Sequence, residues 1–424
     1  MKEVEIISFG CRLNSFESEV MRQHAKAADL NDVVIINSCT VTAEATRQAR
    51  QAIRKARKQN PGAKIIVTGC AVQINPEMFE QMDEIDVLLG NQEKLEPESF
   101  ENIARGHMPR VQVKDIMKAK TTMGHMINGF EGRVRAFIEV QTGCDHRCTF
   151  CIIPFGRGNS RSVPVDRVIS QARLLVRNGY KEIVLTGVDL TSYGHDLPDA
   201  PSLGTLVESI LNEVPDLPRL RISSIDPAEV DEALFRVMTE QPRVMPHFHL
   251  SLQSGDNLIL KRMKRRHSRE DAIRLCKTIR RARPEAVFGA DFIAGFPTET
   301  EVMFQNTLEL VDECGLSFLH VFPYSARPDT PAAKMPQVTS AVKKERAKRL
   351  REKGDAAARI TYERSVGTSA SVLVEKIDLE NTSFGHTEHF VPVRMKGCGK
   401  PGEIKQILIT GAGTTMVEGE LLHG

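Results

Sequence analysis

Short apolar runs alternate with segments of helical period along the first hundred residues. The apolar runs predict four strands, at 4–10, 32–38, 64–69 and 85–90. Helical spacing of apolar positions predicts helices near 15–28, 43–59 and 75–83. Strands that alternate with helices are typical of βαβ units with a parallel sheet. We therefore expect an α/β domain built on a parallel sheet over residues 1–105.

A second region repeats this alternation on a larger scale. Residues 106–132 have mixed composition and weak periodicity, so we expect a linker there. Six further apolar runs follow, at 133–140, 182–188, 219–225, 246–252, 286–295 and 317–324. Six βα units predict an open, partial (β/α)6 barrel, because a closed barrel of this kind needs eight. A long helix near 340–363 completes the expected domain, 133–364.

The last sixty residues change to short strands separated by turns. The strands are expected at 369–376, 389–395, 403–413 and 414–422, which predicts a small all-β barrel over 365–424. This segment carries five Lys and Arg against seven Asp and Glu. If it binds RNA phosphates, a local patch such as Arg394, Lys396 and Lys400 would have to serve.

Composition restricts the location and the partners of the chain. No apolar run approaches the ~20 residues of a membrane span, and the N-terminus opens into a strand without a signal-peptide pattern. Nine cysteines in such a chain indicate a reducing cytoplasm, and metal binding or catalysis rather than disulfides. The net charge is only +2, so affinity for nucleic acid must come from local basic patches. Candidate patches are 261–269, 343–353 and a ridge of Arg47, Arg50, Arg54 and Lys58.

Three cysteines lie within one loop that directly follows the strand at 133–140. Cys144, Cys148 and Cys151 have the spacing C-x3-C-x2-C. Thiolates this close together can hold zinc, copper(I) or an iron–sulfur cluster. A structural zinc and an ordinary 4Fe–4S cluster each take four protein ligands, so three leave one metal position open. A zinc knuckle that lacks its last ligand, or three buried core cysteines, are the alternatives.

Another set of three cysteines, the N-terminal set, follows the first three strands of the chain. Cys11, Cys39 and Cys70 each come at or just after the end of one of these strands. The carboxyl ends of parallel strands share one edge of the sheet, where ligands bind. The topology therefore predicts a second three-thiolate site. Cys276, Cys314 and Cys398 belong to neither set and are interpreted as structural.

The residues around both sets carry a family resemblance. Cys144, Cys148 and Cys151, with Phe150 before the last cysteine, resemble the signature of the radical S-adenosylmethionine (SAM) enzymes. The run GCDHRCTFCIIPFGRGNSRSVP is similar to the methylthiotransferases, most of all to the type that modifies threonylcarbamoyladenosine in tRNA. FGCRLN, NSCTVT and GCAVQ resemble the N-terminal motifs of that family, and the last sixty residues resemble its RNA-binding TRAM module.

The resemblance implies two 4Fe–4S clusters and SAM as cofactors. Cys144, Cys148 and Cys151 would hold the cluster whose open iron chelates SAM, and Cys11, Cys39 and Cys70 an auxiliary cluster. Residues at matching strand ends would form the SAM pocket: Phe150, Gly187, Asp189, Gln253, Asp291 and Gly295. Asp291 stands where the superfamily pattern G-x-I-x-G has its first glycine, so the correspondence is looser there.

The same resemblance implies a radical reaction on tRNA. A 5′-deoxyadenosyl radical would take hydrogen from C2 of an adenine, and the auxiliary cluster would deliver a methylated sulfur; side chains alone cannot break such a C–H bond. The substrate would be threonylcarbamoyladenosine beside the anticodon, in an unstacked loop. Its carboxylate needs a basic partner, for which Arg157 and Arg161 are candidates.

The family resemblance also implies the remaining partners and the rival functions. An anticodon stem-loop, SAM, an electron donor and a sulfur source are expected partners, with the protein a cytoplasmic monomer and no membrane involved. Rival substrates are isopentenyl-adenosine in tRNA and an aspartate of a ribosomal protein. A non-catalytic iron–sulfur RNA-binding sensor is the alternative of another class.

Overall fold

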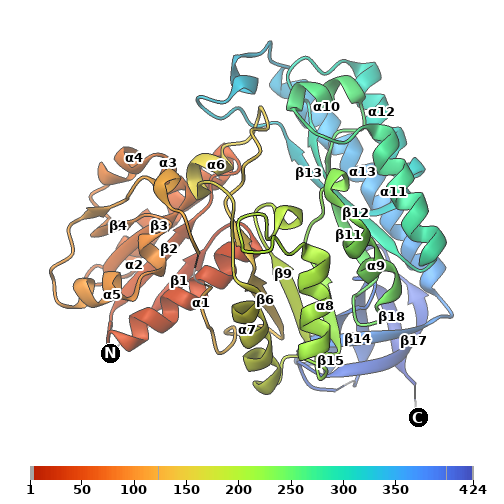
Figure 1. The fold of residues 1–424 in the computed structure, drawn as a ribbon, viewed down its shortest axis with the longest axis horizontal. Helices are drawn as coiled ribbons and strands as arrows, with labels where there is room; N and C mark the ends of the chain where they lie inside the picture. Colours follow the sequence, from red (N-terminus) through yellow and green to blue (C-terminus); the bar gives the residue numbers. More distant parts are fainter. Residues whose placement is uncertain (1–3, 123, 398, 423–424) are drawn as a thin grey trace.

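The chain folds into an N-terminal sheet domain, a central half-barrel and a small C-terminal barrel (Figure 1). The computed structural model describes residues 4–122, 124–397 and 399–422. The half-barrel lies between the other two parts. Within the described residues, no helix is long and apolar enough to cross a membrane.

The N-terminal domain is a parallel sheet with helices on both faces. Its strands, in spatial order, are β1 (Glu5–Ser8), β2 (Val33–Ser38), β3 (Lys64–Gly69), β4 (Val87–Leu89) and β5 (Val111–Gln112). Its helices are α1 (Arg12–Ala27), α2 (Ala43–Gln59), α3 (Cys70–Ile74), α4 (Pro76–Glu80) and α5 (Pro97–Ala104). Alternate residues of β2 enter two different apolar clusters, which explains its unbroken apolar sequence.

Two details of this domain differ from the sequence-based expectation. The helix expected at 75–83 is the shorter α4, which Asn75 caps with Pro76 at its first position, and a further short helix, α3, precedes it. The sheet also gains β5 from within 106–132, the range expected to be a linker. β5 has only two residues, too few to produce a visible alternation of apolar and polar positions.

The central domain is the expected six-stranded half-barrel. Its parallel strands are β6 (Arg135–Glu139), β9 (Glu182–Thr186), β10 (Arg219–Ile222), β11 (His247–Gln253), β12 (Val287–Ala294) and β13 (Leu316–Pro323). They form two three-stranded sheets, β10-β9-β6 and β11-β12-β13, which single bridges join between Leu220 and Val244 and between Ile225 and Leu250.

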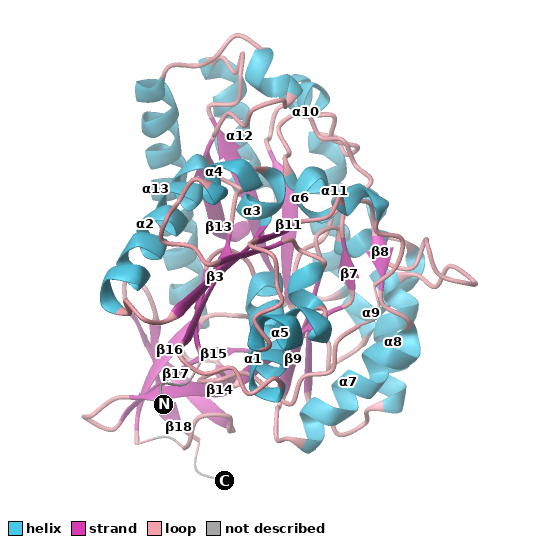
Figure 2. Cartoon of the chain, turned by 90° about the vertical axis from the view of Figure 1, so that its left-hand side faces the viewer, coloured by secondary structure: helices cyan, strands magenta, loops and turns pink. Residues whose placement is uncertain are grey.

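Helices cover the outside of the half-barrel (Figures 1 and 2). They are α7 (Val165–Arg177), α8 (Leu203–Glu213), α9 (Glu232–Glu240), α10 (Asn257–Met263), α11 (Arg269–Ala282) and α12 (Glu301–Glu313). Between β6 and α7 the chain makes the small hairpin of β7 (Gln141–Thr142) and β8 (Arg161–Ser162), with α6 (Ile153–Arg157) inside it. The loop that carries Cys144, Cys148 and Cys151 therefore lies at the carboxyl end of the first barrel strand.

The C-terminal part is a closed five-stranded barrel, reached through the long helix α13 (Ser340–Ser365). Its strands are β14 (Ser369–Ile377), β15 (Thr382–Thr387), β16 (Pro392–Lys396), β17 (Ile404–Ala412) and β18 (Val417–Leu421). The sequence-based expectation omitted β15 and was wrong there. β15 is largely polar, and it contains Gly385, where a Cβ would lie 2.1 Å from the carbonyl oxygen of Leu373.

One buried carboxylate joins the half-barrel to the C-terminal barrel. Glu182, at the start of β9, has no exposed surface and pairs with Arg135, Arg219 and Arg221. The same arginines reach the small barrel, through Glu375, Ser371 and the carbonyl oxygen of Thr387 respectively. Burial alone would raise the pKa of Glu182, but the three guanidinium groups outweigh it and lower the pKa to about 2.

Glu182→Gln should lower the free energy of unfolding by about 3–5 kcal/mol, because it leaves buried guanidinium groups without their counter-charge. Because the pKa of Glu182 is depressed in the folded protein, the wild-type contribution is complete above about pH 4.3 and is lost as the pH falls toward 2. Urea unfolding of the full chain at pH 7 measures the difference. Glu213→Gln, which breaks the exposed pair with Arg173, is the control and should cost about 1 kcal/mol or less. Equal effects of the two substitutions would contradict this account.

Candidate functional site

A cavity of about 400 Å³ lies between the N-terminal domain and the half-barrel, and cysteines from both sets line it. Cys11, Cys39 and Cys70 come from one side and Cys151 from the other. Helix α1 packs on β6, and α3 packs on α6. Across the cavity, Arg327 donates to Thr40 Oγ1 at 2.6 Å, and the Ala43 amide donates to Ser325 Oγ at 3.1 Å. The cavity thus lies at the interface between the two domains.

The N-terminal cysteines reach this cavity from three separate strand ends. Cys11 follows β1, Cys39 follows β2, and Cys70 directly follows β3 as the first residue of α3. Gly10 has φ +96°, and a Cβ at this position would lie 2.9 Å from Cys39 Sγ. Only glycine adopts this backbone conformation easily and leaves that space free. The turn before Cys11 is therefore shaped to bring Cys11 and Cys39 close together.

The second cysteine set, Cys144, Cys148 and Cys151, lies in the loop between β7 and α6. The Cys151 amide donates to the carbonyl oxygen of Cys148, and the Cys144 amide donates to that of Gly158. Arg265 approaches Cys148 Sγ at 3.8 Å. These contacts curl the loop so that its three thiols lie at the carboxyl end of the barrel.

Both sets have donors that suit a 4Fe–4S cluster with one open iron. Burial raises the pKa of Cys39 and of Cys151 to about 11. Thiolates at these positions therefore need a cation in direct contact, which cluster iron provides. In the described part of the chain, two groups of potential metal ligands have donor atoms that all lie within 4.8 Å of one another, and neither group contains a cysteine. Within the described residues, each set offers three soft sulfur donors, which matches the requirement for a cluster that also binds a small molecule.

Arg157 ties the two cysteine sets together. It is almost wholly buried and pairs with Glu17 of α1. It also donates from Nη2 to Asn14 Oδ1 at 2.6 Å and from Nε to Cys70 Sγ at 3.2 Å. Lys94 Nζ contacts the same Glu17 at 2.7 Å. Burial opposes the charge of Glu17, but Arg157 and Lys94 outweigh it and lower the pKa of this carboxyl.

Arg157 and Arg161, the expected partners of a substrate carboxylate, have different surroundings, and only Arg157 lines the cavity. Their contact with the substrate stays a prediction. The guanidinium group of Arg157 already binds Glu17, Asn14 and Cys70. Arg161 is buried, donates to the carbonyl oxygen of Arg157, and is absent from the cavity lining. Sequence reasoning missed Glu17 and Lys94; a Glu on the buried face of α1 was the available signal.

Four of the six expected SAM-pocket residues line the cavity: Phe150, Gly187, Gln253 and Asp291. Gln253 has φ +68°, unusual for a residue other than glycine. Phe150 packs edge-on against Phe296. Gly295 lies elsewhere, against the α13 residue Lys343, and its amide donates to Glu299. Close packing against Lys343 and a φ of +72° both favour glycine at this position, and a contact of Gly295 with SAM stays a prediction.

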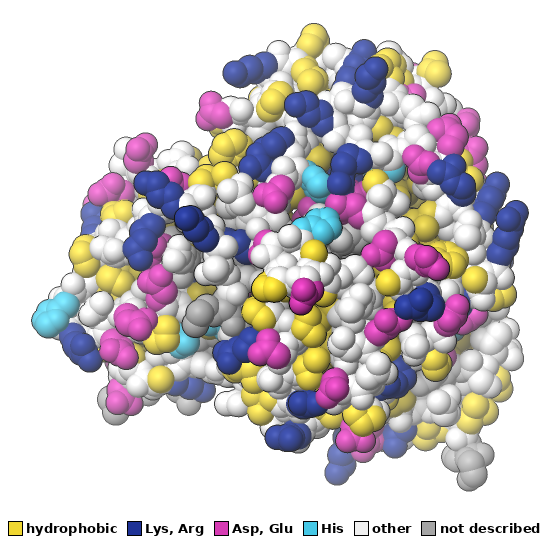
Figure 3. Space-filling model, in the orientation of Figure 1, with side chains coloured by type: hydrophobic (Ala, Val, Ile, Leu, Met, Phe, Trp, Pro, Cys, Tyr) yellow, Lys and Arg dark blue, Asp and Glu magenta, His cyan; other side chains and the backbone are white. Residues whose placement is uncertain are grey.

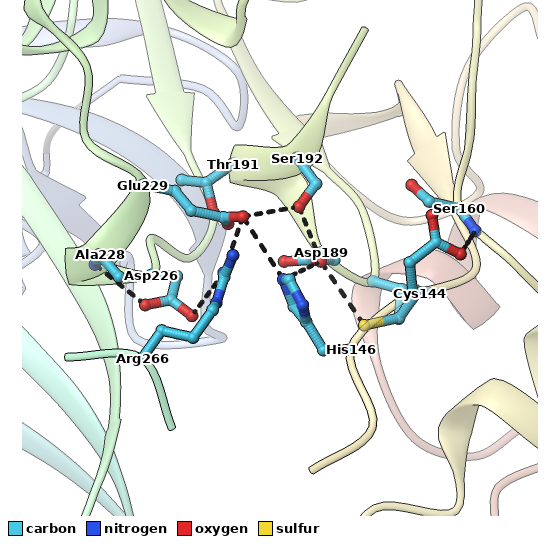
Figure 4. A network of polar contacts seen from close by, with 12 residues as sticks. Cys144, His146, Ser160, Asp189, Thr191, Ser192, Asp226, Ala228, Glu229 and Arg266 are labelled. Carbon is cyan, nitrogen blue, oxygen red and sulfur yellow. Dashed lines mark hydrogen bonds and ion pairs between the residues drawn. The ribbon is translucent and has the colours of Figure 1, made fainter. Parts of the chain in front are cut away.

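Asp189 lies beside the second cysteine set, within a polar network (Figure 4). Its Oδ2 lies 3.5 Å from Cys144 Sγ, accepts a hydrogen bond from Ser192 Oγ at 2.9 Å and forms an ion pair with His146 Nε2 at 2.9 Å. Glu229 contacts the same His146 and also pairs with Arg266. Hydrogen bonds to Asp189 and Glu229 raise the pKa of His146 to about 10, so this imidazole is charged. Sequence reasoning did not single out His146, although it lies between two of the cysteines.

Many of the Lys and Arg side chains in the two expected basic runs form ion pairs with carboxylates of the protein itself. In the first run Arg265 and Arg266 pair with Asp226, and Arg269 pairs with Glu313. In the second run the ion pairs are Arg346–Glu299, Arg349–Glu301 and Lys353–Asp312. On the face drawn in Figure 3, Lys and Arg are interspersed with Asp and Glu. These runs therefore do not form a uniform basic surface.

The remaining candidate residues lie away from the cavity. Arg47 of the α2 ridge pairs with Glu44, and Arg394 of the small barrel pairs with Glu418. Cys276 and Cys314 are buried in the core of the half-barrel, whereas Cys398 lies outside the described residues. The predicted RNA contacts of the ridge and of the small barrel stay predictions.

Comparison with known sequences agrees with this geometry. A family model described as "Radical SAM superfamily" matches residues 138–311, and one described as "Uncharacterized protein family UPF0004" matches 3–90. The chain is 50% identical to the threonylcarbamoyladenosine tRNA methylthiotransferase MtaB of Rickettsia prowazekii, over 92% of this chain and 91% of that protein. It is 36% identical to MtaB of Aquifex aeolicus, over 96% and 100%.

The chain is also similar, at lower sequence identity, to an enzyme with another tRNA substrate and to a solved radical SAM structure. The tRNA-2-methylthio-N(6)-dimethylallyladenosine synthase of Roseobacter denitrificans is 31% identical, over 97% of both chains. Among solved structures, the radical SAM methyltransferase TsrM of Kitasatospora setae matches with a TM-score of 0.56 at 14% identity, over 78% of this chain and 77% of that one. That match supports the fold alone. The identities over nearly full length show that the chain belongs to the radical SAM methylthiotransferases, in the group of the threonylcarbamoyladenosine tRNA enzymes.

Proposed function

We propose that this protein adds a methylthio group to C2 of N6-threonylcarbamoyladenosine beside the anticodon of tRNA. The observation that carries the proposal is the single cavity lined by cysteines of both sets. A reaction that removes hydrogen from a carbon and places sulfur on the same carbon needs both cofactors to reach one substrate atom. The family relationship adds the substrate, because the relatives at 50% and 36% identity are threonylcarbamoyladenosine tRNA methylthiotransferases.

The residues of the chain hold and enclose the cofactors. Cys144, Cys148 and Cys151 would bind the cluster that chelates SAM, and Cys11, Cys39 and Cys70 the auxiliary cluster. When bound, these groups supply the 5′-deoxyadenosyl radical and the sulfur. Asp189, held by His146 and Ser192, offers a carboxylate beside Cys144 to the amino group of SAM. Apolar residues exclude water from the cavity: Phe150, Ile152, Ile293, Phe322 and Tyr324.

The proposal also includes partners whose binding sites we do not assign. The reaction needs an external electron donor and a sulfur source, and we expect the protein to act as a monomer. The tRNA substrate is the reason to expect a cytoplasmic location. With much of its basic charge in internal ion pairs, the protein would hold the anticodon stem-loop through local patches such as the exposed Lys261 and Lys264.

Loss of the protein from its host should remove the 2-methylthio group from threonylcarbamoyladenosine and leave the unmethylthiolated nucleoside in its place. Mass spectrometry of nucleosides from total tRNA measures both species. The 2-methylthio derivative of isopentenyl-adenosine, where the host makes it, is the internal control and should not change. Loss of that nucleoside instead would assign the protein to the related substrate.

Replacement of Cys11, Cys39 and Cys70 together by alanine should reduce the iron content of the reconstituted protein from about eight to about four per chain. The remaining cluster should still cleave SAM to 5′-deoxyadenosine, but no methylthiolated RNA should form. Anaerobic iron analysis and product chromatography measure these results. An iron content that does not fall would refute the auxiliary site.

Arg157→Ala should weaken the auxiliary site, because Arg157 contacts Cys70 and holds Glu17 at the seam between the domains. We expect the free energy of unfolding to fall by about 3–5 kcal/mol, as for other broken buried ion pairs, and iron to be lost from the N-terminal set. Arg167→Ala on the exposed surface of α7 is the matched control. Normal iron content with reduced RNA affinity would instead return Arg157 to the role of a substrate contact.

A further inference from the structure

A second cavity, of about 490 Å³, lies at the open side of the half-barrel. All three parts of the chain contribute to it: α1 of the N-terminal domain, the barrel strands β10, β11 and β13, and the small C-terminal barrel. Its volume lies in the range of small-ligand sites. The proposed function, as described above, does not involve this cavity.

The cavity carries an excess of positive charge. Three arginines line it, Arg12, Arg221 and Arg351, against one carboxylate, Asp355. Arg221 already has partners within the protein, since its three nitrogens donate to Glu182 and to the carbonyl oxygens of Thr387 and Glu388. Arg12 is different: within the described part of the chain it has no hydrogen bond and no ion pair. A half-buried guanidinium group without a partner is costly unless a ligand supplies the anion.

A second polar group in the cavity also lacks a partner. His247 is 9% exposed, and its Nε2 is buried with no hydrogen-bond partner among the described residues. Its ring stacks on Phe390, with centroids 5.1 Å apart, and Phe390 stacks on His386 in turn. The ring is therefore held in place while its nitrogen remains available. Arg12 and His247 come from different domains and lie in the same cavity.

Asp291 links this cavity to the one between the cysteine sets. Asp291 lines the cysteine cavity. Its Oδ1 contacts His249 Nε2 at 2.9 Å and His320 Nδ1 at 3.2 Å, and both histidines line the second cavity. A nucleobase with its reacting carbon in the cysteine cavity could therefore extend a substituent past Asp291. Arg12 is also the residue next to Cys11, so the chain itself connects the two cavities.

We propose that the second cavity is the subsite for the N6 substituent of the substrate adenosine, with Arg12 as the partner of its carboxylate and His247 as a hydrogen-bond partner of its urea group. The inference rests on the proposed function and deepens it. A threonylcarbamoyl group carries one carboxylate and a polar urea, which matches one unpaired guanidinium group and one unpaired ring nitrogen. A dimethylallyl group has no polar atom and would leave both buried groups unsatisfied, so the cavity also rejects that substituent.

The test compares binding of two anticodon stem-loops that differ only in the modification. One carries threonylcarbamoyladenosine beside the anticodon, and the other carries plain adenosine. Affinities are measured by fluorescence anisotropy for the full-length wild-type protein and for Arg12→Gln, Arg12→Lys, His247→Phe and Lys26→Gln. Lys26 is exposed on the same helix as Arg12 and is absent from the cavity lining, so it serves as the control. The ratio of the two affinities within each variant cancels changes in cluster content that affect both RNAs equally.

The wild type should prefer the threonylcarbamoyl stem-loop by about tenfold or more, the effect of a hydrogen bond to a charged group. Arg12→Gln should remove most of this preference without weakening the plain stem-loop, and Arg12→Lys should restore part of it. His247→Phe keeps the stacked ring and should reduce the preference to a smaller extent. Lys26→Gln should behave as the wild type.

Two results would overturn the subsite. Equal weakening of both stem-loops by Arg12→Gln would assign Arg12 to the phosphate backbone, and an unchanged preference would remove it from recognition. Failure of the proposed function is distinguishable, because the wild type itself would then form no 2-methylthio-threonylcarbamoyladenosine and show no preference between the RNAs.

Discussion

The buried ion pairs of Glu17 with Arg157 and Lys94 hold the two halves of the site together. Glu17 belongs to α1 of the N-terminal domain, and Arg157 closes the loop that carries the second cysteine set. A buried pair of this kind adds little net stability, but removal of either partner is costly, so it fixes one arrangement of the domains. Phe16 and Val20 of α1 add apolar contacts to the core of the half-barrel. The cavity between the cysteine sets depends on this one docking geometry.

The same docking also builds the second cavity. Helix α1 begins at the auxiliary cysteine set and presents Arg12 to the open side of the half-barrel. The small barrel is held by Glu182 and its three arginines, and it contributes Phe390 and His386 from the opposite side. Chemistry and substrate selection would thus use neighbouring spaces that share the wall formed by Asp291.

Sequence reasoning predicted the three-part fold and both cysteine sets, because these depend on local patterns and on the shared edge of a parallel sheet. It missed β15, whose polar sequence and internal Gly385 hide the alternation of the strand. It also could not show the ion pair between Arg157 and Glu17, because spacing along the chain does not place these two residues side by side. Arg12 and His247 were missed for the same reason: each is unremarkable in the sequence and becomes distinctive only when its surroundings offer it no partner.

The origin of each cysteine set has a consequence for how the protein matures. Cys144, Cys148 and Cys151 share one short loop, so their sulfur atoms are near one another even in a chain that is not fully folded. Cys11, Cys39 and Cys70 come from three separate strand ends and meet only after β1, β2 and β3 have paired. Assembly of the proposed auxiliary cluster would therefore wait for the sheet, whereas the loop would capture iron earlier. Maturation then has a built-in order, set by how far apart the ligands lie along the chain.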